Sequence, residues 1–329
     1  MLTVTLQRIH NATQNYLGAD RWVGTGRSLI AIAQLTVLCF TPTRFLFVPI
    51  AGETPKPQCD GWKSLTAYCL GNEESRPWIT VLLIAILLLV IVGIFPALTA
   101  VPHYWATISI STGISLPDGG EAAAQVITLF LVFLLIGDRR RSHWDSASLR
   151  TAPQGPMLGF TWAAHWVIRL QMAWIYINAA IPKLSVQEWK DGTAIYYVTR
   201  GEFFGAPTHL QNAVHWVTSV PWLELSLTWG TIATELAIAY FLLFGKNRFR
   251  LVSLGLCVAL HVGIIIVIGL WSFALVMIGG VVAAMAGTPA KMPTIAIRTR
   301  VSEVPEAPTT TIPDEDAHRV RDERLTTSI

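Results

Sequence analysis

Lys183 stands at the end of a long apolar stretch, directly after Pro182, which lacks a backbone N–H and favours the end of a helix. Trp189 and Tyr196 follow in the next segment and supply aromatic side chains able to line a cavity. An amine that is partly removed from water can act as a base or a nucleophile. These residues indicate Lys183 as a candidate catalytic base, with Trp189 and Tyr196 as candidate cavity walls. The alternative is a lysine that anchors a helix end at a membrane surface.

Three further ionisable residues, Arg169, Glu235 and His261, lie inside apolar stretches. Ionisable side chains are costly at bilayer depth, so each is a functional candidate. Counted at about 1.5 Å per residue from the ends of their segments, all three lie roughly 15 Å deep. We therefore expect an intramembrane polar layer, with an Arg169–Glu235 ion pair and His261 nearby. Such a layer fits a packing role as well as a proton-relay or substrate role.

The composition places these residues in a membrane protein. The chain has 329 residues, of which 52% are hydrophobic and only 14% charged, and its mean hydropathy is +0.49. Soluble domains carry roughly 25% charged residues. A net charge of +3 is too small to indicate nucleic-acid binding. We expect an all-α integral membrane protein in contact with the lipid bilayer and no nucleic acid.

Eight apolar segments approach the length needed to cross a bilayer, which is about 20 residues with roughly 17 to 25 tolerated. The third is the weakest, because it contains His103 and several Ser and Thr residues. The segments are residues 28–50, 78–95, 98–116, 121–137, 159–181, 222–244, 251–268 and 270–287.

Charge placement favours eight crossings. If the third segment crosses, the basic clusters at the N-terminus, at 139–141, at 246–250 and at 291–300 all face the cytoplasm, as the positive-inside rule requires. We expect both termini in the cytoplasm and no cleavable signal peptide. The predicted divisions are a cytoplasmic segment 1–27, a transmembrane domain 28–287 and a cytoplasmic tail 288–329. The tail is too polar to fold from about residue 302.

The same topology puts three loops outside the cytoplasm. Cys59 and Cys69 lie in the first, with nine residues between them, in an oxidising location where a disulfide or two free thiols are both compatible with the sequence. Asp118 and Glu121 lie at the second and are candidate acidic neighbours of Lys183. No metal-ligand spacing is found.

Several motifs resemble the bacterial sporulation-delaying protein B family. They are Gln171 through Tyr176, Ala179-Ala180, Lys183-Leu184, Trp189, Gly192-Thr193-Ala194, Tyr196-Tyr197, Leu116 through Gly120, Asp138 with His143-Trp144, and His261 followed by Gly269 through Phe273. The resemblance covers most of residues 28–287. It implies a multi-pass protein of the bacterial cell membrane. It further implies a small SdpA-like partner (sporulation-delaying protein A) and a secreted peptide precursor that becomes a mature antimicrobial peptide.

That family in turn resembles the membrane part (the HTTM domain) of the vitamin K-dependent gamma-carboxylases. The resemblance implies that Lys183 corresponds to their lysine base, that His261 corresponds to a histidine of the seventh segment, and that a lipid-soluble, quinone-like cofactor is the substrate of that base. The carboxylases also have a catalytic histidine at the position where this chain has the Asp118-to-Ala123 run without one. Their large soluble domain is missing as well.

Three hypotheses follow. The first is a membrane protein that matures or exports a secreted antimicrobial peptide through Lys183-based chemistry at the outer membrane face. The second is a transporter or channel that uses the Arg169, Glu235 and His261 layer. The third is a non-catalytic scaffold or immunity-type protein that binds the peptide.

Overall fold

The computed structural model describes residue 13, residues 16–48, residue 57, and residues 59–115, 118–148, 150–202, 205–246 and 248–287. These residues belong to one compact unit, Met1–Pro289. Within the described ranges the protein is helical, and an isolated β-bridge joins Ile94 to Ser142. Most of the predicted N-terminal segment 1–27 and all of the predicted tail 288–329 lie outside the described residues.

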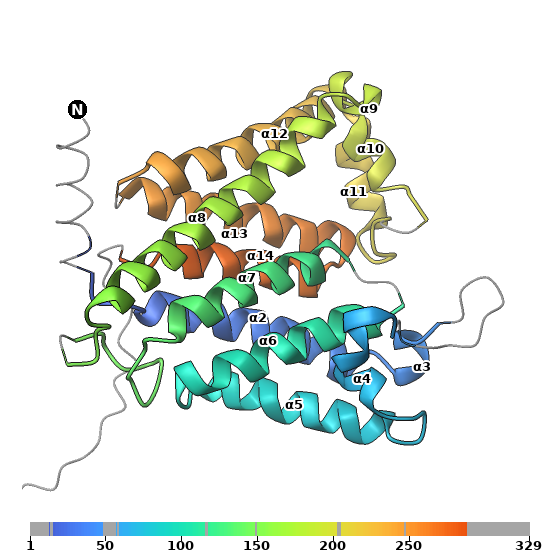
Figure 1. Cartoon of the computed structure of the whole chain (residues 1–329). Coiled ribbons are helices and arrows are strands. Elements are labelled where there is room, and N and C mark those ends of the chain that lie inside the picture. Colours follow the sequence, from blue (N-terminus) through green and yellow to red (C-terminus); the bar gives the residue numbers. More distant parts are fainter. Residues whose placement is uncertain are drawn as a thin grey trace, which may run out of the picture. The chain divides into compact units, whose positions relative to one another are not determined.

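Each of the eight apolar segments forms a long helix (Figure 1). The helices are α2 (Arg21–Phe40), α5 (Arg76–Val92), α6 (Pro96–Gly113), α7 (Gly119–Leu135), α8 (Pro156–Lys183), α12 (Pro221–Phe244), α13 (Arg248–Ile268) and α14 (Trp271–Ala284). Short helices occupy the connections: α3 (Thr43–Leu46), a 3-10 turn (Gly61–Leu65), α4 (Ala67–Leu70), α9 (Gln187–Lys190), α10 (Ala194–Val198) and α11 (Gln211–Ser219).

The first helix differs from its expected bounds at both ends. It begins at Arg21 and not at residue 28, because the Asp20 carboxylate accepts hydrogen bonds from the backbone N–H of Trp22 at 3.0 Å and of Val23 at 3.3 Å. It ends at Phe40 and not at residue 50, shortly before Pro42, which cannot continue a helix. A capping carboxylate at one end and a proline at the other therefore override the boundaries expected from hydropathy.

Helix α14 lies at the centre of the core and packs against α2, α7, α8 and α13. Gly26 allows the backbone of α2 to cross close to α14, because a Cβ atom at this position would overlap the Gly279 carbonyl oxygen and the Ala283 backbone. Gly280, on another side of α14, faces the Met172 side chain of α8. Small residues on α14 therefore let several helix backbones approach one another. A second hydrophobic cluster joins α2, α5 and α6.

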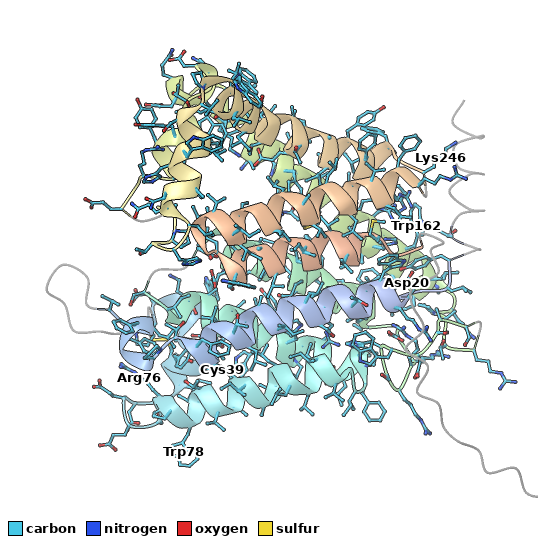
Figure 2. The ribbon with its side chains drawn as sticks, turned by 180° about the vertical axis from the view of Figure 1, so that it is seen from behind. Asp20, Cys39, Arg76, Trp78, Trp162 and Lys246 are labelled. Carbon is cyan, nitrogen blue, oxygen red and sulfur yellow. A yellow bond between two sulfur atoms is a disulfide. The ribbon has the colours of Figure 1, made fainter. Side chains whose placement is uncertain are left out.

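The long helices run between two ends with different chemistry. One end, here called the disulfide end, carries Cys59, Cys69 and helices α3, α4, α9, α10 and α11. The other, here called the basic end, carries Asp20, residues 139–141 and Lys246. Figure 2 shows Asp20, Trp162 and Lys246 at one end and Arg76, Cys39 and Trp78 at the opposite end.

Within the described ranges, three helices, α2, α12 and α13, are long and apolar enough to cross a membrane. Helices α5, α7 and α14 are apolar but shorter. The outward faces of the peripheral helices are also apolar, as expected for surfaces in contact with lipid rather than water. Examples are Trp78, Val81 and Leu88 on α5, Trp222, Leu225 and Tyr240 on α12, and Val252, Val258 and Ile266 on α13.

Polar residues of the weak third segment find their partners inside the bundle. His103 of α6 is buried and its Nε2 lies 3.3 Å from Gln34 Oε1, while Gln34 Nε2 donates to Thr107 Oγ1 at 2.9 Å. Buried polar groups that are hydrogen-bonded carry little cost. The segment is therefore helical in spite of its modest hydropathy.

The loop between α7 and α8 closes the basic end around a buried histidine. The His143 ring packs against Gly24 of α2 and Gly93 at the end of α5, and its Nε2 lies 3.3 Å from Ser28 Oγ. Burial, helped by the Arg27 and Arg140 guanidinium groups, lowers the pKa of His143 to about 3. The ring is therefore neutral near pH 7 and serves as a packing group.

Candidate functional site

Lys183 and Glu235 form an ion pair, with Lys183 Nζ 2.5 Å from Glu235 Oε1. Lys183 is the last residue of α8, and Glu235 lies on the face of α12 that packs against α8. The Glu235 side chain is 9% exposed and the Lys183 side chain 21% exposed. Two opposite charges thus meet in a largely buried position where neither is left uncompensated.

Helix α8 presents Lys183 to this position as part of a continuous buried face. Tyr176 and Ala180 are buried and precede Lys183 by seven and three residues, which places all three on one side of the helix. Pro182, expected to end the helix early, lies in its last turn instead, and α8 includes Lys183. The lysine side chain therefore points toward α12.

Trp189, on α9, contacts the Lys183 ammonium, as Glu235 also does. The Lys183 ammonium lies 4.9 Å from the centroid of the Trp189 ring, a distance typical of a cation–π contact. A tight turn after α8 brings α9 back over the amine, and Gly192 then lets the chain pass close to α12. Its φ of +77° is in the left-handed region, and a Cβ atom there would overlap Leu225.

Tyr196 packs on another cation. Its ring lies 3.6 Å from the Arg200 guanidinium carbon. Arg200 in turn donates to Thr218 Oγ1 at 2.8 Å and to the His215 carbonyl at 3.0 Å, and so ties α10 to α11. The observed role of Tyr196 is to support this small helical cap, and its place in a cavity wall stays a prediction.

Arg169 does not pair with Glu235, and that prediction is wrong. Its guanidinium donates to the Ala284 carbonyl at 3.0 and 3.1 Å and to the Ala286 carbonyl at 3.1 Å, and it lies 3.1 Å from His165 Nε2. These acceptors lie at the C-terminal end of α14, at the basic end. Arg169 also precedes Lys183 by 14 residues, or about 21 Å of helix. Glu235 therefore cannot lie beside both cations.

His261 belongs to a buried cluster on the inner side of the Lys183 site. Its Nδ1 lies 2.9 Å from the Cys257 carbonyl oxygen, four residues earlier in α13. The Tyr176 hydroxyl lies 3.2 Å from Cys257 Sγ, and the Tyr176 and His261 rings meet edge to face at 6.1 Å. Tyr176 therefore contacts the His261 cluster and shares its face of α8 with Lys183, seven residues further along the helix.

Asp118 and Glu121 form a helix cap. Asp118 Oδ1 accepts from the Gly120 N–H at 2.6 Å and from the Glu121 N–H at 3.3 Å, while Glu121 Oε2 accepts from the Asp118 N–H at 2.9 Å. This reciprocal arrangement is a capping box at the start of α7. In the structure Lys183 takes its carboxylate partner from Glu235, and the expected neighbours, Asp118 and Glu121, are engaged at α7.

Cys59 and Cys69 are joined by a disulfide, with 5.6 Å between their Cα atoms. The bond fastens the segment before α5 at the disulfide end. In the described part of the chain, no group of three or more His, Cys, Asp or Glu side chains is placed to hold a metal ion.

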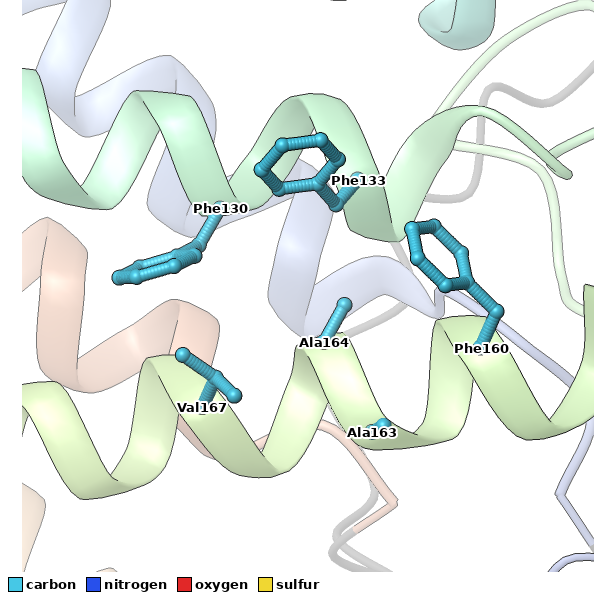
Figure 3. A pocket seen from close by; sticks show the side chains of 6 residues that line it. All are labelled: Phe130, Phe133, Phe160, Ala163, Ala164 and Val167. Atoms are coloured by element: carbon cyan, nitrogen blue, oxygen red, sulfur yellow. The ribbon is translucent and has the colours of Figure 1, made fainter.

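A separate apolar hollow opens between α7 and α8 (Figure 3). It has a volume of about 200 Å³, and its lining is apolar: Phe130, Phe133, Phe160, Ala163, Ala164 and Val167. Val167 precedes Lys183 by 16 residues, or about 24 Å along α8. The hollow therefore lies away from the charged pair and contains no group for catalysis.

Two proteins of Bacillus subtilis (strain 168) are similar to this chain. Sporulation-delaying protein SdpB is 31% identical over 287 residues, which are 84% of this chain and 85% of that protein. The chain belongs to the sporulation-delaying protein B family. Uncharacterized protein YitO is 31% identical over 262 residues, which are 78% of this chain and 82% of that protein. No family model matches the chain. No solved structure matches it.

In this member of the sporulation-delaying protein B family, the sequence pointed to Lys183 and Glu235 separately and missed their pairing. Helical periodicity could have placed each on a packing face, because Glu235 shares a face with the buried Thr228, Ile232 and Ala239. Axial register was the missing information. Counting depth from the loops assumes that neighbouring helices begin and end at the same level. In the structure, the end of α8 packs beside Glu235, which lies 14 residues into α12.

Proposed function

We propose that this protein acts in the bacterial cell membrane in the production of a secreted antimicrobial peptide, and that the Lys183–Glu235 pair is its reactive group. Membership of the sporulation-delaying protein B family supports the process. One observation carries the site, namely a buried ammonium–carboxylate pair at the end of α8, with an aromatic ring over the amine. Buried charged pairs of this kind are frequent where proton transfer occurs.

The proposed membrane arrangement has eight crossings, formed by α2, α5, α6, α7, α8, α12, α13 and α14, with the transmembrane domain spanning residues 28–287. Basic residues gather at one end and the disulfide lies at the other, which supports a cytoplasmic basic end, cytoplasmic termini and an outer disulfide end. Lys183 is then closer to the outer face than Arg169. A peptide precursor secreted across the membrane would meet the site from that side.

The proposed partners are a small SdpA-like protein and the secreted peptide precursor. Helices α9 to α11 lie around the Lys183 site at the disulfide end and offer an outward surface with Tyr197 and Trp216 exposed. Aromatic side chains are enriched at protein and membrane interfaces. The geometry supports this process more than transport through a polar layer, since Arg169 and Glu235 occupy different levels of the bundle.

The test compares the mass of the secreted peptide from cells that carry wild type, Lys183→Ala or Lys190→Ala. Lys190 lies on α9, seven residues after Lys183, and serves as the matched control. We expect Lys183→Ala to abolish the mature peptide, because the substitution removes the amine and leaves Glu235 as an unpaired buried carboxylate. Lys190→Ala should give the wild-type mass and yield. A normally matured peptide from the Lys183→Ala cells would overturn the proposal.

A further inference from the structure

The two oxygens of Glu235 have different surroundings. Oε1 accepts from Lys183, whereas Oε2 is buried and has no hydrogen-bond partner among the described residues. The side chain that carries it is 9% exposed. A buried, unpaired carboxylate oxygen is costly and requires an explanation such as a catalytic role or a bound group. Oε2 is the one unused acceptor that the observed pair presents.

In the ion pair, one of the two residues has lone pairs that can accept a proton and the other does not. An ammonium has three N–H donors and no lone pair, so it cannot act as a base until it loses a proton. Loss of that proton from Lys183 would leave the Glu235 carboxylate buried without its counter-charge. We take the ammonium–carboxylate state as the resting state of this proposal, because it corresponds to the observed ion pair. In that state the free lone pairs belong to Glu235.

We infer that Glu235 takes a proton from the substrate through Oε2 and that Lys183 remains an ammonium that holds the resulting anion. This assignment rests on the proposed function and specifies its chemistry. The H–X bond of the substrate breaks, the proton moves to Oε2, and the electron pair stays on X. The X anion then replaces the Glu235 carboxylate as the partner of Lys183. The site contains one positive and one negative charge before and after the step.

Charge balance also defines the class of substrate. The pair is neutral as a whole, so it has no surplus charge to attract an ionic substrate, and a second buried ion would be unpaired. The substrate is therefore a neutral weak acid with an O–H, N–H or C–H proton. Trp189 lies over the amine, and Ile181 and Leu184, which are near Lys183 in the chain, are exposed apolar residues. These surroundings favour a substrate with an apolar portion, which can approach from the membrane.

Two substitutions separate Glu235 from Lys183 as the base. E235Q keeps the size of the side chain but removes the proton acceptor, and we expect the amount of mature secreted peptide to fall about 100-fold or more. K183R keeps a cation, since a guanidinium retains its proton and cannot act as a base. We expect K183R to lower the yield less than about tenfold. Loss of the peptide in K183R, with substantial peptide from E235Q, would assign the base to Lys183 and overturn the inference.

A labelling measurement tests the charge state without any substrate. The full-length protein in detergent is treated with acetic anhydride across a range of pH, and acetylation of Lys183 is compared with that of Lys190 by peptide mass spectrometry. We expect E235Q to raise the rate at Lys183, relative to Lys190, by about tenfold or more, because loss of an opposite charge favours the free amine. An unchanged ratio, or wild-type Lys183 as reactive as Lys190, would contradict the inference.

The two experiments fail in distinguishable ways. Normal peptide from Lys183→Ala, K183R and E235Q alike would overturn the proposed function together with the inference. Peptide that depends on Lys183 but not on Glu235 would retain the proposed function and overturn the inference alone.

Discussion

At the scale of single residues, two cations of α8, Arg169 and Lys183, are compensated by different kinds of partner. Arg169 is compensated by backbone carbonyls, which carry partial charges and cannot exchange protons. Lys183 is compensated by Glu235, which can. The first arrangement stabilises the end of a helix, because a cation near the last carbonyls interacts favourably with the helix dipole. The second is suited to proton transfer. Of these two cations on α8, Lys183 and not Arg169 has a carboxylate partner.

Arg169 and Glu235 should contribute to stability independently. We expect Arg169→Gln to lower the free energy of unfolding by about 2 kcal/mol, because it leaves buried carbonyls at the end of α14 without donors. Adding Glu235→Gln should give the sum of the two single effects within about 0.5 kcal/mol, since the sites lie far apart. The free energy of unfolding of wild type and the three variants is measured by SDS titration in mixed micelles. A coupling energy above about 1 kcal/mol would show that the two residues interact after all.

At the scale of helices, the architecture depends on small residues at one crossing. Helix α14 is buried on nearly every side, and its glycines allow α2 and α8 to approach it. The cost of glycine in a helix interior is offset by the close packing that it permits between neighbouring helices. The position of α14 matters for the site, because α14 fixes α8 on one side and α13, with His261, on the other. Its packing thus determines where Lys183 lies.

Gly26→Ala should disturb this crossing. The added methyl group would meet the backbone of α14, which cannot move aside as a flexible side chain would, and α2 must shift outward. We expect a loss of about 1 to 3 kcal/mol in the free energy of unfolding. Gly230→Ala on α12 is the matched control, because nothing lies within 4 Å of a Cβ atom there. The control should remain within about 1 kcal/mol of wild type. Equal stability of both variants would contradict the tight crossing.

At the scale of the whole molecule, the separation of charge and disulfide gives the bundle a direction. Basic side chains at one end match a cytoplasmic surface, and the disulfide at the other matches an oxidising compartment. The alternation of the eight long helices of the described residues between these ends supports the even number of crossings that we propose. Under the proposed topology, Lys183 is at the end of α8 nearer the outer side.

Surface labelling of single cysteines tests this direction. Thr208→Cys and Ser146→Cys place an exposed thiol at the disulfide end and the basic end, in a Cys39→Ala background, with Cys257 buried. We expect a membrane-impermeant maleimide to label Thr208→Cys in intact cells and Ser146→Cys only after permeabilisation. Labelling of both in intact cells would rule out the proposed topology, as would the reverse pattern.

The sequence alone determined the helical class and the approximate positions of the eight long helices, and it indicated Lys183 as a candidate site residue. These features follow from local properties: apolar segments of sufficient length, a proline near a helix end and a lysine beside aromatic residues. Family membership was likewise accessible from motifs such as Lys183-Leu184. Helix boundaries were less accurate, as α2 shows, because a single Asp20 side chain shifted its start by seven residues.

Only the tertiary structure decided which charges meet. Glu235 and Lys183 are 52 residues apart, and their pairing depends on the axial position of α8 relative to α12, which packing around α14 and the short helices α9 to α11 determines. Arg169 was equally plausible as a partner from depth alone. Side-chain periodicity shows which face of a helix is buried but carries no information on how far two helices slide along each other. The axial position of α8 relative to α12 therefore decides that Glu235 pairs with Lys183 and not with Arg169.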